Sequence, residues 1–205
     1  MKAIVFHEQG GIDKLRYEEV PAPIIDPSEV LVKVKACAVN RLDLRARQDR
    51  PEVHPFPHIL GSDIAGDVIE IGAEVREIAI GERVVLSPCI PCRQCADCLS
   101  DDENLCDFQV ILGFQTNGGY AEYVKAPAQN VVRLPSGLSY IDAAALPIAY
   151  LTAWHMLVTR AQIRPGDDVL ILSAGSGVGS AGLQIAKLCG ARVFATASTD
   201  EKLER

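Results

Sequence analysis

The feature that most constrains the fold of this chain is a cluster of cysteines, because five of its seven cysteines lie between Cys89 and Cys106. Four of them have the spacing Cys92-x2-Cys95-x2-Cys98-x7-Cys106, in which short loops can gather four thiolates around one tetrahedral zinc ion. Since protein would fill all four positions, this zinc would be structural. Cys89 extends the same rhythm and leaves the register ambiguous, and we take it as the spare cysteine.

Two other interpretations of the cluster are a set of reduced surface cysteines without metal and a zinc ribbon that binds nucleic acid. The ribbon is disfavoured because acidic residues lie between the cysteines, namely Asp97, Asp101, Asp102 and Glu103. The whole chain is acidic too, with 20 basic and 27 acidic residues and a formal net charge of −7. Neither a nucleic acid nor an anionic membrane surface is therefore an expected partner.

Short apolar or alternating runs separated by glycine turns predict a β-rich domain in residues 1–135, which includes the cysteine lobe at 89–106. We expect it to form a compact barrel. The expected strands are Lys2–His7, Leu15–Val20, Val30–Lys35, Asp63–Ile71, Arg83–Leu86 and Tyr120–Lys125. A short helix is expected over Asn40–Gln48, with Asn40 able to cap it.

The pattern changes after Pro135, and residues 136–205 predict the start of a doubly wound parallel sheet. The expected elements are helices at Ser139–Leu146 and Ile148–Arg160, a strand at Asp168–Leu172, a helix at Val178–Cys189 and a strand at Arg192–Ala197. A sheet of this kind needs more strands to cover its faces. We therefore expect a truncated domain, and a 205-residue chain that is inactive by itself.

A glycine-rich turn, Leu172-Ser-Ala-Gly-Ser-Gly-Val-Gly-Ser-Ala-Gly182, joins the predicted strand to the predicted helix. In that context the turn indicates a dinucleotide site, because glycines let a pyrophosphate approach the N–H groups that begin the helix. The expected cofactor-binding residues of the turn are Gly175, Ser176, Gly177, Val178 and Gly179. A tight turn without a ligand is the alternative.

The end of the second strand bears on the choice of nucleotide. An acidic residue that binds the ribose of NAD is expected about 20 residues after the turn, and Ala197 stands there. A small residue leaves room for a 2′-phosphate, which Ser198 and Lys202 could contact. The sequence therefore favours NADP(H) over NAD(H).

Together these motifs resemble the N-terminal part of the medium-chain dehydrogenase/reductase superfamily, which contains the zinc alcohol dehydrogenases and the quinone oxidoreductases. The resemblance covers the whole chain and is carried by the segments Glu29–Leu44, Pro57–Gly66, Cys92–Cys106 and Leu151–Trp154. It implies a mixed α/β fold, with a GroES-like β-barrel catalytic domain followed by a Rossmann domain.

The departures from the zinc alcohol dehydrogenases are informative. In that branch two cysteines and a histidine hold a catalytic zinc, and the matching positions here are Asn40, Ser62 and Ile148. Isoleucine cannot bind zinc, and asparagine and serine are poor ligands for it. Leu42 also replaces the hydroxyl residue that relays protons in many of these enzymes. This part of the chain resembles the zinc-independent quinone oxidoreductases.

Without zinc to polarise a carbonyl, hydride transfer is easier to a conjugated acceptor. We therefore expect NADPH-dependent reduction of an enone or quinone, with Asn40 and Thr152 as the catalytic residues. Asn40 would donate a hydrogen bond to substrate or nicotinamide ribose, Thr152 would lie near the nicotinamide, and Arg41 would meet the pyrophosphate. Asp43 and Asp63 would orient their neighbours. The alternatives are a zinc-type alcohol dehydrogenase and a non-catalytic nucleotide-binding or structural homologue.

The sequence also gives an expectation for the location of the protein in the cell and for its partners. Met1–His7 reads as a strand and not as a signal peptide, and the longest apolar stretch, Ala143–Val158, is broken by Pro147 and His155. We expect a soluble, cytoplasmic protein with a small-molecule substrate, no nucleic-acid or membrane partner, and a homo-oligomeric state when full length.

Overall fold

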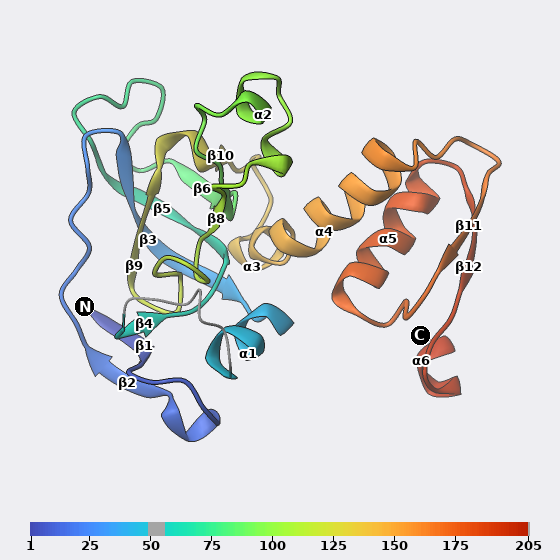
Figure 1. Ribbon diagram of the computed structural model, residues 1–205, viewed down its shortest axis with the longest axis horizontal. Coiled ribbons are helices and arrows are strands. Elements are labelled where there is room, and N and C mark those ends of the chain that lie inside the picture. Colours follow the sequence, from blue (N-terminus) through green and yellow to red (C-terminus); the bar gives the residue numbers. More distant parts are fainter. Residues whose placement is uncertain (49–55, 205) are drawn as a thin grey trace. The chain divides into compact units, whose positions relative to one another are not determined.

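The computed structural model describes residues 1–48 and 56–204, and it divides the chain into two compact units, Met1–Ala145 and Leu146–Arg205 (Figure 1). The sequence suggested a division after residue 135. The first unit extends further because helix α3, Tyr140–Ala144, packs onto it, with Ala143 and Ala144 buried against Ala65.

The first unit is built mainly from antiparallel strands. Its strands are β1 Lys2–Phe6, β2 Arg16–Glu19, β3 Glu29–Ala38, β4 His58–Ile59, β5 Asp63–Ile71, β6 Arg83–Leu86, β7 Cys89–Ile90, β8 Val110–Ile111, β9 Tyr123–Pro127 and β10 Val131–Arg133. They form a five-stranded sheet in the order β10-β6-β5-β3-β9, a three-stranded sheet in the order β2-β1-β4, and the hairpin β7-β8. The helices are α1 Arg41–Gln48, α2 Ala96–Leu99 and α3, with 3-10 turns at Ile12–Lys14, Glu103–Leu105 and Ala128–Asn130.

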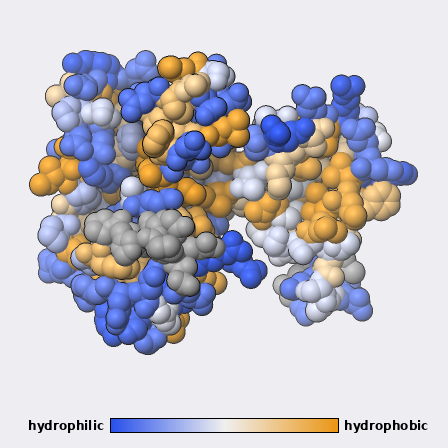
Figure 2. All heavy atoms as spheres, in the orientation of Figure 1, coloured by the Kyte–Doolittle hydropathy of each residue, from blue (hydrophilic) through white to orange (hydrophobic). Residues whose placement is uncertain are grey.

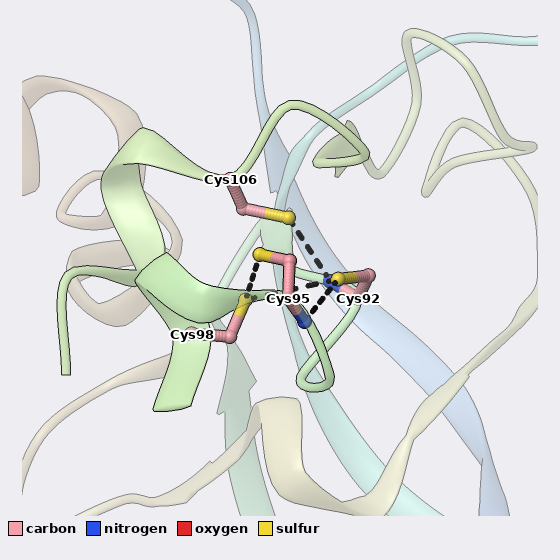
Figure 3. A group of neighbouring side chains, drawn as sticks. All are labelled: Cys92, Cys95, Cys98 and Cys106. Carbon is pink, nitrogen blue, oxygen red and sulfur yellow. Dashed lines mark hydrogen bonds between the residues drawn. The ribbon is translucent and has the colours of Figure 1, made fainter. Parts of the chain in front are cut away.

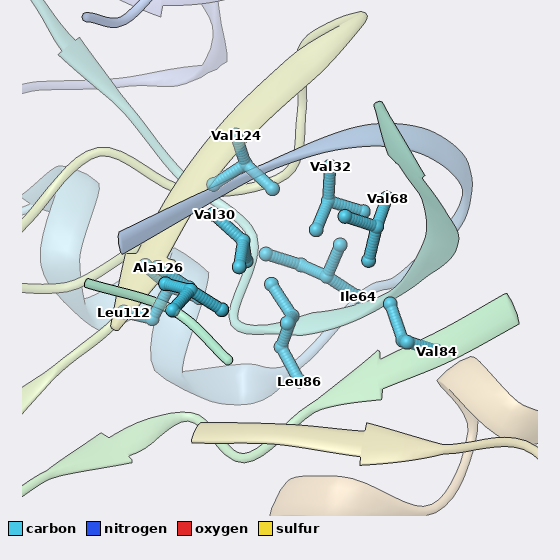
Figure 4. Packing of buried hydrophobic residues seen from close by; sticks show 10 residues of the cluster. Val30, Val32, Ile64, Val68, Val84, Leu86, Leu112, Val124 and Ala126 are labelled. Atoms are coloured by element: carbon cyan, nitrogen blue, oxygen red, sulfur yellow. The ribbon is translucent and has the colours of Figure 1, made fainter. Parts of the chain in front are cut away.

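The main hydrophobic core lies on one face of the five-stranded sheet. Val30 and Val32 of β3 are fully buried there beside Ile64 and Val68 of β5, and Figure 4 shows these side chains pointing toward one another. Lys33 is exposed on the same strand, as the alternating sequence predicts. This packing fixes the pairing of β3 with β5, which positions the residues that follow β3.

One predicted strand is misplaced at its start. Tyr120–Lys125 was expected, but β9 begins at Tyr123. The residues before it instead meet β1, because the Ile4 N–H donates to the Tyr120 carbonyl at 2.8 Å and Ala121 forms an isolated bridge with Ala3. The Tyr120 backbone is thus bonded to β1, and its side-chain hydroxyl takes part in the polar cluster described below.

The second unit contains one β-α-β arrangement. Its elements are α4 Pro147–Trp154, the π-helical segment His155–Arg160, β11 Asp168–Ile171, α5 Gly177–Leu188, β12 Arg192–Ala195 and α6 Asp200–Leu203. Strands β11 and β12 pair in parallel, and α5 buries Ala186 against Val169 and Ile171. The helix expected over Ile148–Arg160 changes character after Trp154, since bonds such as Ala161 N–H to Met156 O span five residues.

The other face of this two-stranded sheet is open. Leu170 and Phe194, which alternate with the buried residues of their strands, are 61% and 50% exposed, and Figure 2 shows hydrophobic surface on this unit. The predicted strand Arg192–Ala197 ends at Ala195, although the Thr196 N–H still donates to Ile171 O at 3.0 Å.

Among the described residues, no helix is both long enough and apolar enough to cross a membrane.

Candidate functional site

The four cysteines of the predicted zinc site lie together in a lobe between β7 and β8. The Sγ atoms of Cys92, Cys95, Cys98 and Cys106 are all within 4.8 Å of one another (Figure 3). The separations are 3.5 Å between Cys95 and Cys98 and 3.9 Å between Cys92 and Cys98. Four sulfurs at the Zn–S distance of about 2.3 Å in a tetrahedron would be about 3.8 Å apart. The thiols therefore fit a zinc ion without rearrangement of the backbone.

The backbone around the cluster is arranged to stabilise thiolates. The Cys95 N–H donates to Cys92 Sγ at 3.4 Å, and the Cys92 N–H donates to Cys106 Sγ at 3.4 Å. Hydrogen bonds from the backbone of Gln94 and Cys95 lower the pKa of the Cys92 thiol to about 6. The turn that aims these donors passes through Arg93, whose φ is +60°. Thiolates are the form in which cysteine binds metal.

Cys89 lies outside this group. It belongs to β7, where it pairs with Ile111, and burial raises the pKa of its thiol. Its carbonyl accepts a hydrogen bond from Asn130 Nδ2 at 2.7 Å. The structure therefore agrees with its assignment as the spare cysteine, although the rhythm of the sequence left that choice open.

A second polar cluster lies where β3 ends and α1 begins. The carboxylate of Asp43 is 4% exposed and accepts hydrogen bonds from three donors. These donors are the Asn40 N–H at 2.6 Å, the Gly61 N–H at 3.2 Å and the Tyr120 hydroxyl at 2.8 Å. Burial raises the pKa of Asp43, and burial together with this carboxylate raises the pKa of Tyr120. Tyr120, which sequence reasoning missed, therefore keeps its proton and acts as a donor.

Asn40 joins this cluster by its backbone N–H, and its side chain reaches a second carboxylate, that of Asp63. Its Nδ2 donates to Asp63 Oδ2 at 2.8 Å, and Asp63 is 2% exposed at the start of β5. The proposed helix cap is not formed, because no N–H of the described residues donates to Asn40 Oδ1. Asp43 instead closes the start of α1 by accepting from the Asn40 backbone. Arg41, the first residue of α1, is exposed.

Among the described residues, the groups around Asn40 are poorly suited to bind zinc in the arrangement that they take. Asn40 turns its amide nitrogen, which cannot bind a metal, to Asp63. Ser62 is fully buried, and its Oγ is without a hydrogen-bond partner among the described residues. Cys37 packs closely against Gly61, and burial and the charges of Asp43 and Asp63 raise the pKa of its thiol well above the ordinary value. A neutral thiol is a poor metal ligand.

In the second unit the glycine-rich turn leads directly into α5. Ser176 caps this helix by accepting from the Gly179 N–H at 3.1 Å. A Cβ added at Gly179 would lie 2.3 Å from Ser173 O, so only glycine allows the helix to start so close to β11. A Cβ at Gly175 would meet only the Lys202 side chain, at 3.6 Å. The turn is thus tightly packed at Gly179, whereas its rim, formed by Gly175 and Gly177, is open. This arrangement fits a dinucleotide phosphate.

Other predicted residues of the second unit lie near the end of β12, at the start of α5 or on α4. Lys202 Nζ donates to Ser198 Oγ at 3.1 Å, and the Lys202 stem reaches the rim of the glycine turn. Val178 follows Gly177 in the first turn of α5 and is half-buried. Thr152 is exposed on α4, where its hydroxyl donates to Ile148 O at 2.6 Å. The predicted residues thus divide between the units: Asn40 and Arg41 belong to the first, and those near the turn and Thr152 to the second.

Comparisons with known proteins place these features in a family. Residues 26–136 match the alcohol dehydrogenase GroES-like domain. An alcohol dehydrogenase of Geobacillus stearothermophilus is 38% identical over 98% of this chain and 59% of its own length. A quinone oxidoreductase of Pongo abelii is 32% identical over 98% of this chain and 54% of its own length.

Solved structures agree with these relatives. The crystal structure of an NAD-dependent alcohol dehydrogenase is 45% identical, with a TM-score of 0.95, over 100% of this chain and 60% of that one. A cobalt- and zinc-bound alcohol dehydrogenase from Pyrobaculum aerophilum is 38% identical, with a TM-score of 0.93, over 100% of this chain and 61% of that one. The chain therefore spans little more than half the length of these relatives. With its mixed helix-and-sheet fold and its GroES-like domain, the chain belongs to the medium-chain dehydrogenase/reductase superfamily and corresponds to the N-terminal part of its members.

Proposed function

We propose that the full-length protein is an NADP(H)-dependent oxidoreductase that transfers hydride to a conjugated carbonyl or quinone, with one structural zinc and no catalytic zinc. The observation that carries this proposal is the hydrogen bond between Asn40 and Asp63, beside the buried Ser62 hydroxyl. These residues stand at positions where the zinc alcohol dehydrogenases place metal ligands or their neighbours. An amide, a buried hydroxyl and a carboxylate already engaged by that amide form a poor zinc site.

The poor zinc ligands that the described residues offer at this place would limit the chemistry. A catalytic zinc stabilises developing negative charge on an alcohol or carbonyl oxygen by several kcal/mol. Without it, an acceptor whose charge spreads over a conjugated system has the lower barrier. An enone or a quinone is such an acceptor, which is why we prefer these substrates to simple aldehydes.

The structural zinc would be held by Cys92, Cys95, Cys98 and Cys106. Their Sγ separations of 3.5 and 3.9 Å suit a tetrahedral ion, and backbone N–H groups already point at Cys92 and Cys106. Four protein ligands leave no place for substrate. The metal would therefore stabilise the fold of the lobe and take no part in hydride transfer.

The nucleotide would be bound chiefly by the second unit. When bound, NADPH supplies the hydride. The rim of the turn at Gly175 and Gly177 is open to a pyrophosphate, and the free N–H groups that begin α5 favour its charge. Ser198 and Lys202 supply a hydroxyl and an ammonium close to Ala197, where a 2′-phosphate would meet no carboxylate.

The remaining predicted residues would contact the cofactor or substrate. Arg41 is exposed and offers its guanidinium to the pyrophosphate, as the resemblance implies. Asn40 would bind the substrate or the nicotinamide ribose with the polar atoms that Asp63 leaves available. Thr152 would contact the nicotinamide with the oxygen of its hydroxyl, since the hydroxyl proton is donated to Ile148 O.

A second candidate is a zinc-type alcohol dehydrogenase that oxidises alcohols. It is favoured by the name of the 38% identical relative and of the solved structure with the TM-score of 0.95. A third is a non-catalytic homologue that has kept the fold. The test is to screen the full-length protein for NADPH oxidation with quinones, enones and aldehydes, and for alcohol oxidation with added zinc. Enone or quinone turnover without added metal supports the first candidate, and zinc-dependent alcohol oxidation alone would replace it with the second.

A further inference from the structure

One buried carboxylate fixes the geometry around Asn40. Asp43 accepts from the backbone of Asn40, from the backbone of Gly61 and from the Tyr120 hydroxyl. These three donors belong to segments far apart in the sequence. Since hydrogen bonds to a buried charge are among the stronger ones in proteins, Asp43 holds the start of α1 and the start of β5 in a defined position.

The same arrangement brings the side chain of Asn40 to Asp63. Ala38, at the end of β3, is the strand partner of Asp63, at the start of β5. Asn40 Nδ2 then lies 2.8 Å from Asp63 Oδ2, and the carboxylate is 2% exposed. Asp63 Oδ2 accepts from the Asn40 amide nitrogen. The flipped amide would instead set two oxygens against each other.

We propose that Asp63 is a positioning residue that fixes which end of the Asn40 amide is presented to a bound ligand. Asn40 is left with Oδ1, to which no described residue donates, and with one remaining N–H. Such a pair fits a ligand group that both donates and accepts, which is the chemistry of a hydroxyl such as that of a ribose. This inference rests on the proposed function only in assigning a ligand contact to Asn40.

The orientation of Asn40 can be measured by NMR on the 15N-labelled chain, independently of turnover. The Asn40 side-chain amide signal is identified by its loss in Asn40→Ala. In the unmodified chain it should exchange with water roughly ten-fold or more slowly than that of Asn104, which is exposed. In Asp63→Asn the fixed charge is lost while the shape is kept, so this signal should move and its exchange should quicken.

A matched control separates positioning from general loosening. Tyr120→Phe removes one donor to Asp43 but leaves the Asn40–Asp63 hydrogen bond, so the Asn40 amide should keep its slow exchange. If Asp63→Asn does not fold, the comparison of Asn40 with Asn104 in the unmodified chain still decides the contact. Equally fast exchange at both residues, or an Asn40 signal unmoved by Asp63→Asn, would overturn the proposal.

Kinetics then test whether the orientation matters. In the full-length protein, Asp63→Asn should raise the KM for NADPH about ten-fold or lower kcat/KM by as much, but should add nothing to Asn40→Ala. A merely structural role would lower activity further in the double variant. Full activity of Asp63→Asn, or additive losses, would refute the positioning role. An unmodified protein without any turnover would instead refute the proposed function, while the NMR result would still decide the Asn40–Asp63 contact.

Discussion

Replacing Cys95 by serine tests whether the four cysteines between β7 and β8 bind a zinc ion that stabilises this lobe. Cys95 Sγ lies 3.5 Å from Cys98 Sγ, inside the four-thiol group. The lobe has little hydrophobic core of its own, because Leu99, Leu105 and Phe108 are 75%, 54% and 70% exposed. Its regular structure is limited to one turn of α2, a 3-10 turn and the two-residue strands of the hairpin β7-β8. A bound ion would therefore be the main source of its stability.

The size of the effect follows from the linkage between metal binding and folding. A free zinc concentration about 1,000 times the Kd stabilises the folded form by about 4 kcal/mol. Ile90 and Leu112 stand at the base of the lobe and pack in the core of the five-stranded sheet, so the loss is transmitted to the first unit. At about 2–4 °C per kcal/mol for a chain of this size, Cys95→Ser should lower Tm by about 10 °C.

The assay combines metal analysis with thermal unfolding, and Cys89→Ser is the matched control. Purified protein should contain close to one zinc per chain, Cys95→Ser close to none, and Cys89→Ser as much as the unmodified protein. Cys89 sits only a few residues away and is half-buried in β7, so both variants exchange a thiol for a hydroxyl in the same lobe. Zinc retained by Cys95→Ser, or lost from Cys89→Ser, would refute the ligand assignment.

Three further predictions concern the rest of the chain. Even with excess zinc, the full-length protein should hold no second tightly bound ion, because Asn40, Ser62 and Ile148 stand where ligands would be needed; elemental analysis giving two equivalents would contradict this. Ala197→Asp should reverse a preference for NADPH over NADH in titrations of the full-length protein, since the new carboxylate would repel a 2′-phosphate; tighter NADH binding by the unmodified protein would count against the reasoning. Gly179→Ala should destabilise the second unit by about 1–3 kcal/mol, because its Cβ would lie 2.3 Å from Ser173 O, whereas Gly175→Ala, which meets only a flexible lysine, should change stability by less than about 0.5 kcal/mol in urea unfolding.

The features that the sequence predicted well depend on residues close together along the chain. Strands β5 and β6 have the predicted bounds, Asp63–Ile71 and Arg83–Leu86, because alternation and flanking glycines are local signals. The four-thiol group is likewise read from spacing, since loops of two and seven residues leave the cysteines few other arrangements. The β-α-β arrangement follows from one apolar strand and one glycine turn.

Elements with weak local signals were not predicted. The two-residue strands β4, β7 and β8 are too short to show a periodicity, and each exists through its partner strand. The bounds of β9 were shifted because Tyr120 and Ala121 face β1, which is more than a hundred residues earlier in the chain. The end of the first unit at Ala145 depends on the burial of α3 against β5.

The polar cluster around Asn40 shows most clearly what tertiary structure decided. By sequence alone Asn40 suits a helix cap and a ligand contact equally well, since both need only a short polar side chain after a strand. In the structure no N–H of the described residues donates to Asn40 Oδ1, so the cap is not formed. The β3–β5 register instead sets Asp63 opposite Ala38, and the buried carboxylate accepts from the Asn40 amide nitrogen. Tyr120 reaches Asp43 from 77 positions away. Spacing and periodicity thus predicted the four-thiol group and the glycine turn, whereas strand pairing determined the partners of Asn40, because hydrogen bonds between distant segments form only after the sheet has brought them together.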